Sequence, residues 1–164
     1  MAVPAGKVRA YADTSVFGGV QDEEFREASR QFFRRVKRGD YMILLSTLTL
    51  REIAGAPSNV RRVLAELPRS QIAEIPPEAE DEAERLADAY IAAGVLEGTS
   101  RADATHVAIA TVARADLILS WNFRHIVNYQ RIGEFNRVNA LNGYPRIEIH
   151  SPLEVAYADE DEGI

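Results

Sequence analysis

Val8-Arg-Ala-Tyr-Ala12 is a short apolar run, and Asp13-Thr-Ser15 follows it directly. An apolar run of this length, with no helical period and with a break after it, predicts a buried β-strand. Tyr41-Met-Ile-Leu-Leu45 is a second run of the same kind, and it leads at once into a helix that carries Glu52. The first predicted strand therefore ends at an acidic residue, and the second leads into a helix that carries one early in its length.

Strands and helices alternate along the rest of the chain. Helices are predicted over residues 22–37, 48–54, 59–67, 78–93 and 101–114, and further strands over 72–75, 117–119 and 146–149. Gly18-Gly19 is expected to open a loop, Ser100 to begin a capping box, and Ser151 to start a last short helix. The alternation predicts an α/β fold, in which a parallel sheet carries helices on both faces.

The composition is that of an ordinary globular domain. The 164 residues are 46% hydrophobic and 27% charged, which is enough apolar material for a core. No cysteine is present, which excludes disulfides and thiolate chemistry. The N-terminal residues lack the apolar segment of a signal peptide, and no apolar run reaches membrane-spanning length, so we expect a cytoplasmic protein without membrane contact. We expect one domain over residues 1–157 and a disordered acidic tail over 158–164.

The charge distribution is uneven. The net charge of −6 argues mildly against binding a polyanion. Basic residues are nevertheless concentrated in Arg30–Arg38, in Arg61-Arg62 and between Arg124 and Arg137. A solvated helix face is the plainer interpretation of any one of these runs.

Three acidic residues, Asp13, Glu52 and Asp103, stand where an apolar segment meets a break. In an open parallel sheet, residues at the carboxyl ends of the strands converge on one crevice. Carboxylates gathered there repel one another unless a cation joins them, so a divalent-metal site is the first hypothesis. Taken singly, each acid also has a plain structural interpretation: a turn for Asp13, a helix start for Asp103 and an exposed helix position for Glu52.

Four segments together resemble the PIN-domain ribonucleases, a family that includes the toxin subunits of many toxin–antitoxin pairs. They are Tyr11–Phe17, Ser46–Ile53, Arg101–Ala110 and Ala115–Ile126, and they occur in the order of the family. The resemblance implies a three-layer α/β/α sandwich around a central parallel sheet of about five strands. It also implies an acidic pocket that binds Mg²⁺ or Mn²⁺, and metal-dependent cleavage of single-stranded RNA.

By motif match, Asp13, Glu52 and Asp103 are the acidic, catalytic residues of that pocket, and the metal ion is expected on Asp13, Asp103 and Asn122. The fourth motif departs from the family pattern. Asn122 occupies the polar position nearest the strand, and His125 stands where a further Asp is often found. An amide oxygen can bind Mg²⁺ without adding charge, so three carboxylates would face the dication. That count suits one tightly held ion, with a second only when substrate phosphate is present.

The implied mechanism places the metal ion on the scissile phosphate, where it stabilises the added negative charge and lowers the pKa of a bound water. Glu52 completes the acidic cluster and orients that water. Hydroxyl groups beside the motifs are expected to bind phosphate oxygens, and arginines to offset substrate charge. These substrate-binding candidates are Thr14, Ser15, Ser120 and Arg124, with Arg51 and Arg101 as further arginines. A solvated surface role is the plainer alternative for each arginine.

The resemblance also implies partners. Toxins of the family often form homodimers and bind an antitoxin protein across the active-site groove. Phe25, Phe32 and Phe33, which alternate with arginines, are candidates to line such a groove, although packing in the core is the plainer interpretation.

Several alternatives remain open from the sequence. His106 follows Asp103 by three residues and is expected either to bond to that acid or to pack in the core. Trp121 and Phe123 either stack on an RNA base or pack inside the protein. A PIN-like module that binds RNA or protein with weak or no catalysis is the competing function. A receiver-like or phosphohydrolase domain ranks last, because Asp13 lacks an acidic neighbour and no lysine follows Lys37.

Overall fold

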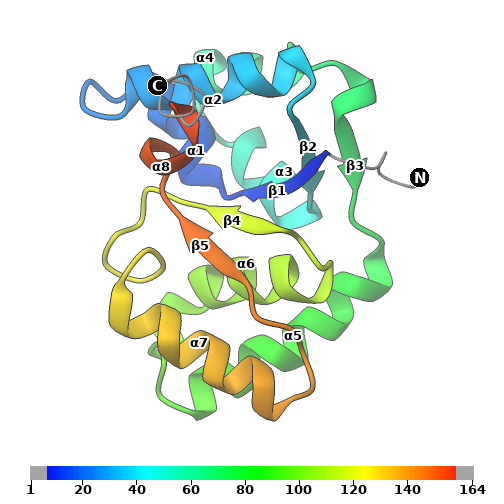
Figure 1. Ribbon diagram of the computed structural model, residues 1–164, viewed down its shortest axis with the longest axis vertical. Helices are drawn as coiled ribbons and strands as arrows, with labels where there is room; N and C mark the ends of the chain where they lie inside the picture. Colours follow the sequence, from blue (N-terminus) through cyan, green and yellow to red (C-terminus); the bar gives the residue numbers. More distant parts are fainter. Residues whose placement is uncertain (1–6, 158–164) are drawn as a thin grey trace, which may run out of the picture.

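A parallel sheet lies at the centre of the computed structural model, which describes residues 7–157 (Figure 1). Within those residues the sheet has five strands: β1 (Val8–Ala12), β2 (Tyr41–Leu45), β3 (Ile72–Glu74), β4 (Leu117–Leu119) and β5 (Glu148–His150). Their order is β3-β2-β1-β4-β5, and every neighbouring pair is parallel. The predicted three-layer α/β/α fold is confirmed. The expected tail, residues 158–164, lies outside the described residues.

Helices cover both faces of the sheet (Figure 1). One layer is formed by α1 (Thr14–Gly18), α2 (Arg26–Arg38), α4 (Ser58–Ala65) and α8 (Pro152–Ala156), and α3 (Thr47–Ala54) packs against α1 and α4. The opposite layer is formed by α5 (Pro77–Ala92), α6 (Arg101–Val112) and α7 (Tyr129–Leu141). Short 3₁₀ helices are η1 (Gly19–Gln21), η2 (Arg69–Gln71) and η3 (Gly98–Ser100). No helix within residues 7–157 is both long and apolar enough to cross a membrane.

The side chains of β1 alternate between two apolar clusters. Ala10 and Ala12 pack with α1, α2 and α4, whereas Tyr11 packs with α5, α6 and α7. This is the two-residue period of a strand that is buried on both faces. It explains why β1 is apolar throughout its length apart from Arg9, and why Asp13 comes at the point where β1 leaves the core.

The strand order creates a switch point between β1 and β4. The chain moves from β1 through β2 to the β3 edge, then returns to the other side of β1 for β4 and β5. Crossovers therefore leave the carboxyl ends of β1 and β4 in opposite directions, which opens a crevice between them. Asp13 follows β1 and Ser120 follows β4, so both residues stand at this crevice.

The structure corrects some of the local predictions. Gly18 and Gly19 do not open a loop, because they end α1 and begin η1. Ser100 makes no side-chain capping bond, and β5 begins at Glu148, two residues later than predicted. Helix α7 was not predicted from the sequence. Its N-cap is Asn128, whose side-chain oxygen accepts a hydrogen bond from the N–H of Arg131.

Candidate active site

Asp13 lies at the switch point and is held by two serines. Its Oδ1 accepts hydrogen bonds from the N–H (3.0 Å) and the hydroxyl (2.5 Å) of Ser15, at the start of α1. Its Oδ2 accepts a bond from the Ser120 hydroxyl at 2.6 Å, across the crevice from the end of β4. Three donors thus fix the orientation of this carboxylate before any ligand arrives. Ser15 and Ser120 were predicted to bind substrate. In the structure their hydroxyls donate to Asp13.

Burial dominates the electrostatics of Asp13, which is only 4% exposed. Removal from water raises the pKa of the Asp13 carboxyl above its ordinary value, and the nearby His106 and the hydroxyls of Ser120 and Ser15 offset the rise only in part. A buried carboxylate at a strand end is therefore kept at an energetic cost. Such a cost is typical of functional sites.

Glu52 reaches the same region from α3. Its Oε1 accepts a hydrogen bond from the Thr14 hydroxyl at 2.8 Å and lies 2.6 Å from Nε2 of His106. The hydrogen bond with His106 is the main cause that lowers the pKa of Glu52, and Thr14 adds to it against the opposing effect of burial. Glu52 is therefore the readily ionised acid of the site, while Asp13 is the one that resists ionisation.

Tyr11 fixes the far side of the His106 ring. The Tyr11 hydroxyl lies 2.7 Å from Nδ1 of His106, 2.9 Å from the Ser46 hydroxyl and 3.3 Å from that of Thr49. Burial raises the pKa of the Tyr11 phenol, so the hydroxyl keeps its proton and can donate it to Nδ1. His106 then presents its Nε2–H to Glu52, which satisfies both ring nitrogens.

The sequence analysis predicted only part of this network. His106 was expected to bond to Asp103 or to pack, and it instead bonds to Glu52 while 3% exposed. Tyr11, Ser46 and Thr49 were not singled out. One clue was present, because Tyr11 is a polar-tipped residue on the strand that ends in Asp13, and a buried phenol needs a partner.

Asp103 stands at the start of α6 and pairs with the second histidine. Its Oδ2 lies 2.9 Å from Nδ1 of His125. Asn122 shapes the turn that carries His125, because its Oδ1 accepts the backbone N–H of Arg124 (3.2 Å) and of His125 (2.9 Å). The amide oxygen of Asn122 is therefore already used twice within its own loop.

The donor chemistry suits a hard divalent cation, because carboxylate and amide oxygens are its preferred ligands. The arrangement does not fit one as it stands. Within residues 7–157, no three His, Asp or Glu side chains are placed to hold a single ion. Each acid is instead bonded to protein groups: Asp13 to serines, Glu52 to His106 and Asp103 to His125. A shared ion would require Glu52 and Asp103 to turn away from their histidines.

The arginines expected near the substrate are placed differently. Arg101 points to α5, where it forms ion pairs with Glu84 at 2.7 Å and Asp88 at 2.5 Å. Arg124 is exposed in the loop after β4, beside the site. Arg51 is exposed on α3 and lowers the pKa of Glu52 slightly through its charge. Of these three arginines, Arg51 lies near Glu52, and Arg124 lies in the turn that carries Asn122 and His125.

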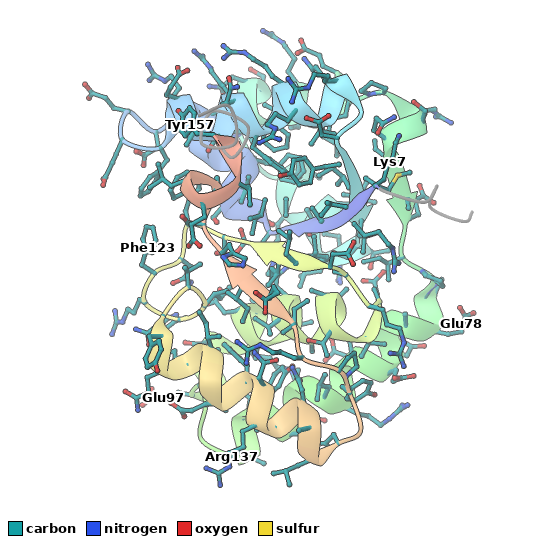
Figure 2. All side chains as sticks on the ribbon, in the orientation of Figure 1. Lys7, Glu78, Glu97, Phe123, Arg137 and Tyr157 are labelled. Carbon is teal, nitrogen blue, oxygen red and sulfur yellow. The ribbon has the colours of Figure 1, made fainter. Side chains whose placement is uncertain are left out.

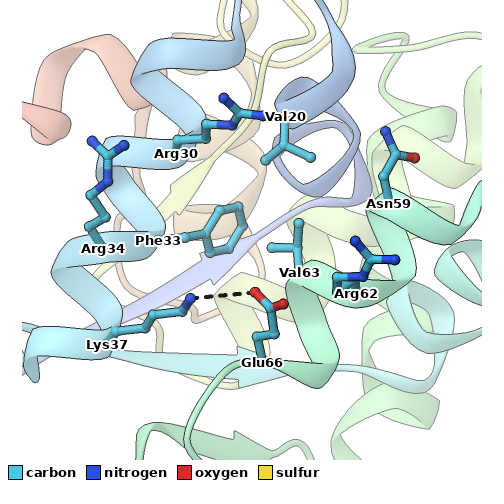
Figure 3. Close-up of a pocket in the computed structure, with 9 residues that line it drawn as sticks. All are labelled: Val20, Arg30, Phe33, Arg34, Lys37, Asn59, Arg62, Val63 and Glu66. Carbon is cyan, nitrogen blue, oxygen red and sulfur yellow. Dashed lines mark ion pairs between the residues drawn. The ribbon is translucent and has the colours of Figure 1, made fainter.

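A basic hollow of about 370 Å³ lies between α2 and α4 (Figure 3). Its walls carry Arg30, Arg34 and Lys37 from α2 and Arg62 from α4, and one ion pair joins Lys37 to Glu66 at 3.6 Å. Its floor is apolar and is formed by Val20, Phe33 and Val63. Phe32 and Phe33 are core residues, as the plainer interpretation had it. Phe33 still contributes to the floor of the hollow, whereas Phe32 does not line it.

Comparison with known proteins bears on the fold. No protein-family model matches the sequence, and no curated protein is significantly similar to it in sequence. A similar solved structure is the crystal structure of VapBC2 from Rickettsia felis bound to a DNA fragment from their promoter. The match has 10% sequence identity and a TM-score of 0.54, and it covers 88% of this chain and 98% of that chain. The chain therefore has the fold of a VapBC2 chain, with almost none of its sequence.

Proposed function

We propose that this protein is a metal-dependent endoribonuclease of the PIN-domain type that cleaves single-stranded RNA. The observation that carries the proposal is the position of Asp13. Its buried carboxylate is held by Ser15 and Ser120 at the switch point of a parallel sheet, with Glu52 and Asp103 joined to the same region through His106 and His125. Four sequence motifs in the order of the family and the VapBC2-like fold support it.

The proposed roles follow from the contacts. Asp13, Asp103 and Asn122 would hold Mg²⁺ or Mn²⁺, which when bound supplies positive charge for the phosphate and acidifies a water. To reach such an ion, Asp103 would have to leave His125, and Asn122 would have to release at least one of the two backbone N–H groups that it accepts. Glu52, whose pKa is lowered, is the carboxylate best suited to orient a water at neutral pH.

The substrate-binding roles are proposed for Thr14, Ser15, Ser120 and Arg124. The three hydroxyls already donate to Asp13 and Glu52, which places them beside the acids where a phosphate oxygen would lie. Arg124 is exposed beside the Asn122 turn, where its charge can offset that of the RNA backbone.

An antitoxin protein is the proposed partner, because the VapBC2 neighbour is named as a pair and is bound to its promoter DNA. The basic hollow between α2 and α4 suits an acidic segment with apolar residues, since its walls are cationic and its floor is Val20, Phe33 and Val63. We also propose that the protein forms a homodimer and acts in the cytoplasm, where RNA is found.

The test is cleavage of a panel of single-stranded RNAs with Mg²⁺ or Mn²⁺ and with EDTA. The parent should cut only with metal, and Asp13→Asn and Asp103→Asn should each lower the rate by at least about 100-fold. Asp81→Asn is the matched control, because Asp81 is exposed on α5 and the same charge is lost away from the site. RNA binding without any metal-dependent, Asp13-dependent cut would overturn the proposal in favour of a PIN-like binding module.

A further inference from the structure

A second hollow, of about 330 Å³, adjoins Asp13 on the side of α1. It is lined by Ser15, Gly18, Gly19, Asp22, Phe25, Trp121 and Asn122. Its volume lies at the lower end of the range of about 300–1,000 Å³ found for small-molecule sites. Ser15 belongs to both places, because the hydroxyl that bonds to Asp13 also accepts the backbone N–H of Trp121 at 2.9 Å. A group in this hollow is therefore next to the Asp13 carboxylate.

One wall of the hollow is a rigid aromatic stack. Phe25 lies on Trp121 with ring centroids 4.1 Å apart and an interplanar angle of 15°. The indole is fixed by a hydrogen bond from its Nε1 to the Ser29 hydroxyl at 2.8 Å, in a space that only a glycine at position 19 leaves open. This wall does not have to be ordered when a ligand arrives, which favours binding.

Phe123 lies beside this pair, with its ring turned against both members. Its ring lies 6.3 Å from Phe25 and 6.1 Å from Trp121, tilted against both, and the residue is 46% exposed. Figure 2 shows it projecting outward from the loop between β4 and α7. An exposed flat ring beside a site proposed to cleave RNA is the kind of platform on which proteins stack the bases of single strands.

The rim of the hollow offers both kinds of hydrogen-bonding group. Asp22 accepts the N–H of Glu24 with Oδ1 at 2.9 Å, and its Oδ2 has no hydrogen bond within residues 7–157. The Asn122 oxygen is used by its own loop, while its NH₂ group has no partner in the same residues. One free acceptor and one free donor match the mixed donor and acceptor edge of a nucleobase.

We propose that the hollow between α1 and the β4–α7 loop is a nucleobase subsite, in which an unpaired RNA base stacks on Phe123 and meets the Phe25–Trp121 pair edge-on, while Asp22 and Asn122 contact its polar edge. The inference rests on the proposed ribonuclease function and adds the part of the substrate that is read next to the cut. The hollow suits a base rather than a phosphate, because its one charged lining group is the carboxylate of Asp22, which would repel a phosphate.

The experiment uses Trp121 as a reporter, because the chain has a single tryptophan. Fluorescein-labelled single-stranded RNA hexamers of one base each are titrated in EDTA, so that metal-dependent cleavage cannot occur. Anisotropy of the label reports binding, and Trp121 emission of a parallel unlabelled sample reports contact with the hollow. Binding should change the emission, and Phe123→Ala should raise the Kd about tenfold, within the range for loss of one stacked base.

Two variants separate stacking from general damage. Phe123→Tyr keeps the ring and should bind like the parent, and Tyr129→Ala removes an aromatic side chain of a residue that is 96% exposed on α7 and should also change nothing. Asp22→Asn should alter the order of preference among the four hexamers. Unchanged affinity in Phe123→Ala, or RNA binding with unchanged Trp121 emission, would overturn the subsite.

The outcome is separable from that of the proposed function. If the parent cuts RNA with Mg²⁺ but Phe123→Ala binds and cuts like the parent, the ribonuclease stands and the subsite is wrong. If RNA neither binds nor is cut, both proposals fail. If RNA binds with the expected Trp121 response but is never cut, the subsite stands and belongs to a binding module.

Discussion

Oε1 of Glu52 lies 2.6 Å from Nε2 of His106, while the other nitrogen of the same ring lies 2.7 Å from the Tyr11 hydroxyl. The imidazole of His106 on α6 thus links Glu52 of α3 with Tyr11 of β1. The position of Glu52 therefore depends, through His106, on the buried Tyr11. A change in the core at Tyr11 is expected to alter both the stability of the fold and the position of Glu52.

The first prediction concerns this link. Tyr11→Phe should lower the free energy of unfolding by about 1–3 kcal/mol, because the buried groups of His106, Ser46 and Thr49 each lose a partner. Urea denaturation at neutral pH measures the change. Tyr129→Phe, which removes a hydroxyl from a fully solvated ring, should leave the midpoint where it is. Equal midpoints for all three proteins would mean that the network contributes no stability.

Asp13→Asn should make the protein more stable at neutral pH, although the same variant is expected to lose the proposed RNA cleavage by at least about 100-fold. The pKa of Asp13 is raised above its ordinary 3.8 in the folded state, so the folded state holds the proton more tightly than the unfolded one. Stability from this group is therefore complete below pH 3.8 and is lost as the pH rises through the raised pKa. The amide carries no charge to desolvate, and the hydroxyls of Ser15 and Ser120 can rotate to suit it.

The expected gain is about 1 kcal/mol at pH 7, shrinking toward acid pH. Denaturant midpoints of parent and variant, measured at several pH values, would show two curves that converge as the pH falls. A variant that is less stable than the parent at every pH would contradict the raised pKa.

Gly19→Ala should destabilise the protein and disturb Trp121. A Cβ at this position would lie 2.4 Å from the Ser29 hydroxyl oxygen and 2.7 Å from Nε1 of Trp121, so it would break their hydrogen bond. A cost of about 1–3 kcal/mol is typical of such overpacking. Thermal unfolding and Trp121 emission both report it.

Gly18→Ala is the matched comparison. A Cβ there has no neighbour within 4 Å, and the residue is helical, so alanine should be neutral or should stabilise by up to about 1 kcal/mol. The same outcome for both glycines would show that Trp121 does not fill the space beside Gly19.

Metal binding gives a fourth prediction. If Mg²⁺ or Mn²⁺ joins Asp13 and Asp103, free ion at roughly ten times its Kd should raise the melting temperature of the parent by about 3–6 °C. The rise should be absent in Asp103→Asn and retained in Asp81→Asn. Because no three acidic or imidazole side chains within residues 7–157 are arranged around one ion, we expect millimolar rather than micromolar ion to be needed. Equal shifts in all three proteins would place the ion elsewhere.

Much of the framework could be predicted from the sequence. Strands β1, β2 and β4 are short apolar runs with clear breaks, and α6 is apolar around its whole circumference, so local patterns were enough. The same patterns put Asp13 at a strand end and Asp103 at a helix start, which is where they are found.

The partners of the acids could not be predicted. His106 and His125 are 19 residues apart, and their choice of Glu52 and Asp103 depends on how α3, α6 and the β4–α7 loop approach one another. Spacing on one helix suggested a pair between His106 and Asp103, but the packing of α6 against the sheet turns His106 toward Tyr11 instead. The pairing of each histidine with its acid depends on tertiary contacts between segments that are distant in the sequence, so a local sequence pattern does not predict it.

The backbone N–H of Ser120 bonds to the carbonyl oxygen of His150 at 3.1 Å, at the end of β4. Ser120 thereby depends on a strand that comes 30 residues later, although its hydroxyl holds an acid near the beginning of the chain. A chain that lacks β5 therefore contains Asp13 and Ser120 but not the backbone bond that holds Ser120 in place. The hydrogen bonds around Asp13 are thus complete only once β5 has paired with β4.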